Sequence, residues 1–136
     1  MSNFERSNFK VPLNLSVRAA NIYLIKAGEY YKIGCSKYPK TRMKRMQTGC
    51  PFKMELVFSV FCHEAFVLEA ALHHVYADKH SYGEWFRNIN PKDCLEIVEI
   101  FNNQMVGHRY IGRYAKIAIA LRIKIEERRR IERAEA

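Results

Sequence analysis

Two short β-prone segments around a turn sequence constrain the fold of this chain more than any other feature. The segments Asn21–Ile25 and Tyr30–Gly34 are rich in isoleucine and tyrosine, and Lys26-Ala27-Gly28-Glu29 separates them. Residues of these types favour strands, and a short glycine-containing loop between two such segments predicts a β-hairpin. We therefore expect a hairpin near the start of the folded domain.

The register of this hairpin decides which side chains meet. If residues 26–29 form a four-residue turn, Tyr23 lies directly opposite Lys32, with Cβ atoms about 5 Å apart. Side chains alternate between the faces of a sheet, so a core face and an opposite face that carries Tyr23 and Lys32 are expected. The core face carries Ile22, Leu24, Tyr31 and Ile33. A nearby ammonium lowers the pKa of a phenol, which would make Tyr23 a base for water; in the alternative, Tyr23 only covers the stem of Lys32.

Helical and strand patterns alternate along the rest of the chain. Pro39 and Pro91 suit the first turn of a helix, and an apolar stripe with helical spacing runs through Leu68 and Leu72. The expected elements are a helix from Pro39 to about Gln47, a strand Met54–Cys62, a helix His63–Asp78, a short extended piece Glu84–Phe86, a helix from Pro91 to about Phe101, and a helix from Tyr110 to about Arg133.

These elements predict an α+β fold. It is expected to be an α/β sandwich in which helices flank a small three-stranded, mainly antiparallel sheet, with a long helix at the C-terminus. The chain has 136 residues, which suits one domain with a modest core. We divide the chain into an N-terminal arm (residues 1–20), a central domain (residues 21–105) and a basic C-terminal helix (residues 106–136).

The distribution of charge indicates a polyanionic partner. The net charge is +9, and the segment Tyr30–Met54 contains seven lysines and arginines without an acidic residue. A second surplus lies in His108–Ala136, with nine lysines and arginines against four glutamates. Because a surface that needs only solvation usually mixes signs, we expect the first region to face phosphate. Charge alone leaves DNA, RNA and anionic membrane open.

The cysteines and the apolar pattern exclude several other classes. The spacing of the four cysteines contains no CxxC pair, which argues against a zinc finger and favours reduced thiols; they are Cys35, Cys50, Cys62 and Cys94. No apolar run reaches about 18 residues, the length that spans a bilayer. The N-terminal residues lack an apolar signal core. We therefore expect no membrane partner and a cytoplasmic location.

Five short motifs in a fixed order carry a family resemblance. They are Asn21-Ile22-Tyr23, Tyr31-Lys32-Ile33-Gly34, Pro39-Lys40-Thr41-Arg42, Val67-Leu68-Glu69-Ala70 (followed by Leu72-His73), and Gly83-Glu84-Trp85-Phe86. Together they resemble the GIY-YIG nuclease superfamily over about residues 21–88, and their order looks like its phage and fungal-meiotic DNA-binding branch. Asn21 stands where the family has its first glycine, and Lys32 stands where its second tyrosine usually is. If a phage encodes the chain, the expected compartment is the host cytoplasm.

The resemblance implies an endonuclease that hydrolyses the phosphodiester bonds of DNA with Mg²⁺ or Mn²⁺. By that resemblance, Glu69 ligates the metal ion, and a single carboxylate with waters suits Mg²⁺. Tyr23 orients or deprotonates the attacking water, and Lys32 holds Tyr23 and that water. Arg42 binds the phosphate and stabilises the charge that develops on it.

Helix geometry adds His73 to these candidates. Glu69 and His73 are four residues apart on one helix face, so His73 is a candidate contact for a metal-bound water or the leaving group. The alternative for His73 is a hydrogen-bonded surface histidine. The alternative for Glu69 is a boundary glutamate that pairs with an arginine.

The other cations of the first basic region are the expected DNA contacts: Lys37, Lys40, Lys44, Arg45 and Lys53. Two alternative functions stay open. One is a catalytically silent DNA-binding protein with the GIY-YIG fold, and the other is an assembly protein whose basic terminal helix docks on a protein or RNA. An apolar stripe on that helix packs on its own domain or on a second copy as a homodimer; it comprises Tyr110, Tyr114, Ile117 and Leu121.

Overall fold

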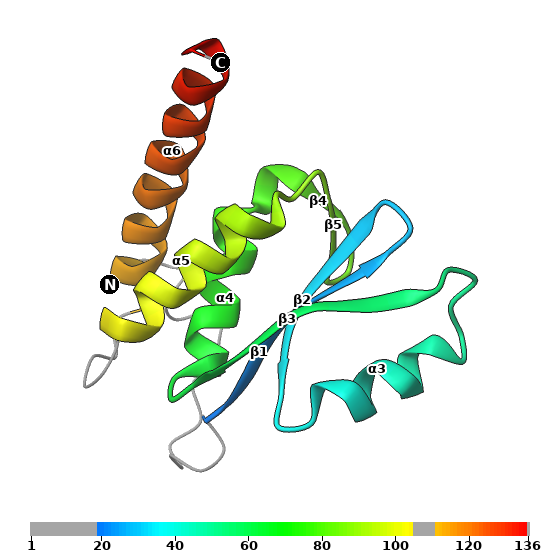
Figure 1. The fold of residues 1–136 in the computed structure, drawn as a ribbon. Coiled ribbons are helices and arrows are strands. Elements are labelled where there is room, and N and C mark those ends of the chain that lie inside the picture. The colour runs from blue at the N-terminus through cyan, green and yellow to red at the C-terminus, as the bar shows by residue number, and fades with distance from the viewer. Residues whose placement is uncertain (1–18, 105–110, 136) are drawn as a thin grey trace.

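The computed structural model describes residues 19–104 and 111–135 (Figure 1). Its elements, in chain order, are β1 (Ala20–Ala27), β2 (Tyr30–Ser36), α3 (Pro39–Gln47), β3 (Met54–Cys62), α4 (Ala65–Val75), the 3₁₀ turn η1 (Ala77–Lys79), β4 (His80–Tyr82), β5 (Trp85–Arg87), α5 (Pro91–Gln104) and α6 (Ile111–Glu135). The expected N-terminal arm, except its last two residues, and the expected domain boundary at residue 105 lie outside the described residues. The helices and the strand β3 begin and end close to the limits that the sequence predicts.

The sheet has five strands in the order β3-β1-β2-β5-β4, and every pairing between them is antiparallel. The α+β class is confirmed, but the prediction of a three-stranded sheet is wrong. The two additional strands, β4 and β5, have three residues each. So short a strand cannot display the alternation of polar and apolar residues by which a strand is found in a sequence.

The first hairpin has a two-residue turn rather than the expected four-residue turn. Gly28 has a φ of 61°, a conformation that glycine adopts without steric cost and that tight hairpin turns require. Tyr23 therefore lies opposite Gly34, and Lys32 lies opposite Ile25, so the expected pairing of Tyr23 with Lys32 is wrong. Because the partners shift by two positions, every side chain stays on its expected face.

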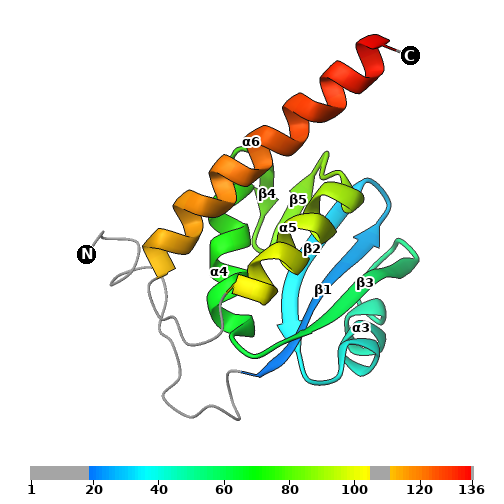
Figure 2. The same ribbon diagram turned by 60° about the vertical axis from the view of Figure 1, so that its left-hand side comes forward.

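Helices pack on both faces of the sheet (Figure 1, Figure 2). The helices α4 and α5 cover one face, with α6 on the outer side of these two helices, and α3 covers part of the other face. The larger core lies under α4 and α5, and its sheet side chains are Ile22, Leu24 and Ile33, as the alternation predicts. The smaller core lies under α3, where Met43 and Met46 pack against Tyr23, Ile25, Ala27 and Met54. The face that carries Tyr23 is therefore also a packed face.

The long C-terminal helix α6 packs against α4 and α5 (Figure 2). Its described apolar contacts with the larger core come from Ile119, Leu121 and Ile125. The other side chains of the expected stripe, those of Tyr110, Tyr114 and Ile117, lie outside the described part of the chain. A homodimer through α6 stays a prediction. In the described ranges no helix combines the length and apolar character that crossing a bilayer requires.

Candidate active site

The candidate site lies where β5 stops pairing with β2. The strand β5 pairs only with Tyr30, Tyr31 and Lys32, so the rest of β2 has no strand neighbour on that side. The helix α4 fills this place with His73, whose Nε2 lies 2.7 Å from the backbone carbonyl oxygen of Ile33. Because a carbonyl oxygen only accepts, Nε2 carries the hydrogen and donates it. The ring of His73 also meets the edge of Phe86, with centroids 5.1 Å apart.

Glu69 lies one turn before His73 on α4 and faces the same open part of β2. The Cys35 thiol donates a hydrogen bond to Oε2 of Glu69 at 2.9 Å, and Nε2 of His73 is 3.8 Å from Oε1. The Glu69 side chain is 16% exposed. Burial raises the pKa of this carboxyl, and the Cys35 hydrogen bond and His73 act in the opposite direction. The expected alternative, a glutamate paired with an internal arginine, does not occur among the described residues.

Cys35 acts here as a hydrogen-bond donor. Burial and the neighbouring Glu69 raise the pKa of its thiol well above its ordinary value, so the sulfur keeps its proton. A protonated thiol is a poor metal ligand, because metal ions bind the thiolate. All four cysteines are free, as the sequence predicts.

Tyr23 reaches the site across the backbone of Gly34. A Cβ atom at position 34 would lie 2.4 Å from the Tyr23 hydroxyl oxygen, so only glycine leaves room for this ring. The side chain is 2% exposed. Burial raises the pKa of Tyr23 to about 12, opposed by the Arg42 guanidinium and reinforced by Glu84 and Glu69. The sequence predicted that a nearby cation lowers the pKa of this phenol. That prediction is wrong, because burial raises the pKa by more than the cation lowers it.

Lys32 forms an ion pair that the sequence does not predict. Its Nζ lies 3.0 Å from Oε2 of Glu84, in the turn between β4 and β5, and the lysine side chain is only 11% exposed. Glu84 was visible in the sequence only as part of a motif. Its position next to Lys32 depends on the pairing of β5 with β2, which the sequence does not display.

Four of the five expected catalytic groups come from four different elements and are close enough for their charges to interact: Tyr23 from β1, Lys32 from β2, Arg42 from α3 and Glu69 from α4. The charges of Arg42, Glu84 and Glu69 shift the pKa of the Tyr23 phenol. Those of Lys32 and Glu84 shift the pKa of the Glu69 carboxyl. The cation whose charge most lowers the pKa of Tyr23 is Arg42, and not the expected partner Lys32. Cys35 and Glu84 complete the cluster, and the sequence did not single them out. His73 adjoins it with Nε2 already bonded to the backbone.

The expected DNA contacts lie on α3 and on the segments that flank it. All five side chains are exposed: Lys37, Lys40, Lys44, Arg45 and Lys53. Within the described ranges none of them forms an ion pair with an acidic side chain, and neither does Arg42. The helix is held to the sheet by its methionines and by Gln47, which accepts a hydrogen bond from the Met54 amide at 2.7 Å. Its charged side chains therefore remain available to a partner.

The donor set of the cluster suits a hard cation that keeps most of its waters. In the part of the chain that the structure describes, no group of three or more histidine, cysteine and acidic side chains could enclose a metal ion. The candidate ligand is the carboxylate of Glu69, with that of Glu84 near it. Carboxylate oxygens are the ligands that Mg²⁺ prefers, and Mg²⁺ is commonly held by one or two of them together with water. The residues present therefore fit Mg²⁺ or Mn²⁺ and do not fit a structural zinc site.

Comparison with known proteins adds the family. Neither a curated protein nor a solved structure matches the chain. Residues 20–102, which run from the start of β1 almost to the end of α5 and include the whole candidate site, match the T5orf172 domain. This match covers well over half of the sequence, and the chain belongs to the T5orf172 domain family.

Proposed function

We propose that this protein is a Mg²⁺- or Mn²⁺-dependent DNA endonuclease of the GIY-YIG superfamily. The observation that carries the proposal is the meeting of a phenol, two cations and a partly buried carboxylate at one open edge of the sheet. Hydrolysis of a phosphodiester needs a positioned water, positive charge at the phosphate, and help for the leaving oxygen. The family supports the same reading, since T5orf172 domains occur in phage proteins and in proteins associated with nucleases.

Each residue of the cluster has a separate task in this proposal. Glu69 is the metal ligand, and a bound Mg²⁺ supplies a Lewis acid for a phosphate oxygen and lowers the pKa of a bound water. Arg42, exposed on α3 and close enough to act on Tyr23, binds the phosphate. Lys32, fixed by Glu84, holds a positive charge beside the reacting atoms. His73 is a positioning residue, because its bond to the Ile33 carbonyl sets the place of α4 and hence of Glu69.

The protonation state of Tyr23 sets a condition on its role as a base. With a pKa of about 12, the phenol keeps its proton at neutral pH in the free protein. Positive charge close to the oxygen favours the phenolate, and Arg42 already acts in this direction. Tyr23 therefore orients the water as a neutral phenol in the free protein. It would act as a base only after bound positive charge lowers its pKa and its own proton has left to the solvent, so that the phenolate can accept the proton of the water.

A plasmid-nicking assay tests the proposal. With Mg²⁺, wild type is expected to convert supercoiled DNA to the open circle, and Glu69→Gln is expected to do so about a hundredfold more slowly. Glutamine is neutral and its amide oxygen can still accept from Cys35, so the fold should tolerate the change. Glu99→Gln, at an exposed position on α5, is the matched control and should cut like wild type. Equal cutting by wild type and Glu69→Gln would sink the proposal.

The second candidate is a DNA-binding protein without turnover. It is favoured by the ion pair that engages Lys32 and by the raised pKa of Tyr23, since both reduce the chemistry available to the free cluster. This candidate predicts that wild type stays inert with Mg²⁺ and with Mn²⁺ but binds DNA. Its affinity for DNA should fall steeply as salt is raised, because phosphate contacts release counterions.

A further inference from the structure

A cavity of about 530 Å³ opens directly beside the candidate active site. Its wall includes Lys32, which also belongs to the proposed catalytic cluster, so the cavity and the cluster share this side chain. Three parts of the chain enclose it: the tip of the first hairpin, the loop after α3, and the β4–β5 hairpin. Its floor is apolar, formed by buried Ala27 and Met54 together with Met46.

Four aromatic side chains of the described ranges line this cavity, and two of them are exposed. Tyr30, Phe52, Tyr82 and Trp85 all line it. Tyr82 is 83% exposed and Phe52 is 48% exposed, whereas Trp85 is half-buried against the smaller core. Large apolar side chains gathered in the open around a hollow commonly mark a binding site. Flat rings around a hollow suit a flat apolar ligand that stacks on them.

The charge around the cavity identifies the kind of molecule that carries this flat group. The exposed cations Arg45 and Lys53 directly precede Met46 and follow Phe52 in the chain, and they form no ion pair with an acidic side chain among the described residues. Lys32 also lies in the wall, where it is paired with Glu84. None of the described residues that line the cavity is acidic. A flat ring attached to a negatively charged backbone is the chemistry of a nucleotide, for which aromatic stacking and adjacent cations are the usual means of recognition.

We infer that this cavity receives a single unstacked nucleobase of the DNA strand whose phosphate lies at the Tyr23–Glu69 cluster. The inference rests on the proposed function, because it assumes a DNA phosphate at that cluster. A base inside a paired duplex is covered on both faces by its neighbours and cannot enter a hollow, so the nucleotide must leave the stack. Unstacking costs least where the nucleotide is unpaired. The substrate class is therefore DNA with an unpaired nucleotide beside the cut phosphate, in a bulge, a gap or a single strand.

Binding measured without metal tests the cavity separately from cutting. Fluorescence anisotropy of the full chain in EDTA compares three labelled DNAs of equal length: a paired duplex, a duplex with a one-nucleotide bulge, and the same bulge with an abasic nucleotide. Wild type is expected to bind the bulge about fivefold to a hundredfold more tightly than either of the others, the range of one base–aromatic stack. The abasic bulge keeps the bend and the phosphates but lacks the base, so it isolates stacking.

Tyr82→Ala identifies the residue responsible. Tyr82 is so exposed that its removal should leave the melting temperature unchanged, and the variant should lose at least about fivefold in affinity for the bulge and nothing for the duplex. Phe61→Ala, at an exposed aromatic on β3 outside the cavity, is the matched control and should bind all three DNAs like wild type.

Three results would overturn the inference. Wild type could bind the bulge and the abasic bulge equally, or Tyr82→Ala could weaken the duplex and the bulge alike. In either case metal-dependent nicking by wild type and its loss in Glu69→Gln would leave the proposed function standing. If wild type neither binds nor cuts any of the DNAs, the proposed function fails and the inference fails with it.

Discussion

The chain has two basic regions that look alike in sequence and differ in structure. The first surrounds α3, where the exposed cations have no acidic partner among the described residues. The second is α6, where four arginines all face carboxylates. The pairs are Arg122 with Asp78 and Glu126, Arg128 with Glu96 and Glu132, Arg129 with Asp93, and Arg130 with Glu127.

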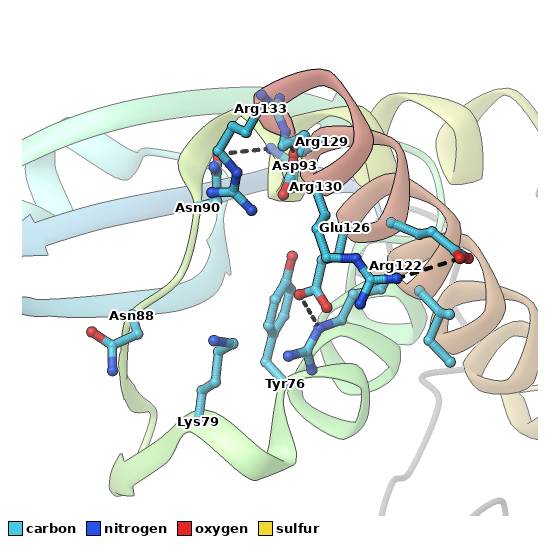
Figure 3. Close-up of a pocket in the computed structure, with 12 residues that line it drawn as sticks. Tyr76, Lys79, Asn88, Asn90, Asp93, Arg122, Glu126, Arg129, Arg130 and Arg133 are labelled. Atoms are coloured by element: carbon cyan, nitrogen blue, oxygen red, sulfur yellow. Dashed lines mark hydrogen bonds and ion pairs between the residues drawn. The ribbon is translucent and has the colours of Figure 1, made fainter. Parts of the chain in front are cut away.

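Figure 3 shows the second region around a cavity of about 540 Å³ between α6 and the segment that contains η1, β5 and the start of α5. Arg122 illustrates its role. This side chain is 12% exposed, donates to the Val75 carbonyl at 2.6 Å, and forms two hydrogen bonds to the Asp78 carboxylate at 2.6 and 3.0 Å. Its guanidinium also lies over the Tyr76 ring, 4.8 Å from the centroid. These contacts hold α6 against α4.

Net charge in a sequence therefore does not locate a phosphate-binding surface. A cation already paired with a carboxylate is largely neutralised, and a phosphate must compete with that carboxylate for its hydrogen bonds. An unpaired exposed cation offers its charge in full and releases counterions when it binds. We therefore propose that α3 faces DNA and that the arginines of α6 hold the fold together, and the following variants test that division.

The largest difference in nicking rate is expected between two variants, each of which lacks one arginine from one of the two regions. Arg42→Gln removes positive charge at the proposed phosphate position and should slow Mg²⁺-dependent nicking about a hundredfold. Arg128→Gln removes a cation that contacts Glu96 and Glu132 on the helix side and should cut like wild type. Initial rates on supercoiled plasmid at saturating DNA give the comparison. An equal loss in both variants would contradict the division.

An intermediate effect is expected for DNA affinity. The double variant Lys40→Gln/Lys44→Gln should weaken duplex binding about tenfold at low salt and reduce the slope of log affinity against log salt by about two, one for each lost phosphate contact. Arg128→Gln/Arg130→Gln should leave both quantities unchanged. Titrations over a series of salt concentrations measure them. If the α6 variant showed the larger change in slope, the two regions would exchange roles.

The smallest effect is expected from the Arg122–Asp78 pair. The Arg122 hydrogen bonds hold the pKa of Asp78 below its ordinary value of 3.8, so the folded state favours the carboxylate more than the unfolded state does. The stabilisation is complete above pH 3.8 and disappears as the pH falls through the lowered pKa. Asp78→Asn should therefore cost less than about 1 kcal/mol at pH 7, since Asp78 is largely exposed, and nothing once the pH is below the lowered pKa. Denaturant unfolding across this pH range measures the difference in the free energy of unfolding between wild type and Asp78→Asn. If that difference did not change with pH, the Arg122–Asp78 ion pair would not be its cause.

Sequence-based prediction worked for elements with a local signal and failed for contacts between residues that lie far apart in the chain. The helix α3 and the strand β3 have their expected bounds because Pro39 and an apolar run are local signals. The strand β4 was missed, and β5 was expected only as a short extended piece, Glu84–Phe86, that was not assigned to the sheet, because each strand has three residues. Without their place in the sheet the sequence could not show that Glu84 meets Lys32, or that Tyr82 and Trp85 line a cavity beside the candidate site.

The alternation of faces in the first hairpin and the α+β class could be predicted from the sequence, because periodicity is a property of short segments. The residues proposed for the site came from a family resemblance. The hairpin register, in which Tyr23 crosses Gly34 rather than facing Lys32, became visible only in the folded chain. The tertiary structure also decided that the pKa of Tyr23 rises, because α3 and its methionines bury that face of the sheet. Burial and ion pairing depend on what packs on a side chain from elsewhere in the chain, and that information exists only once the elements are assembled.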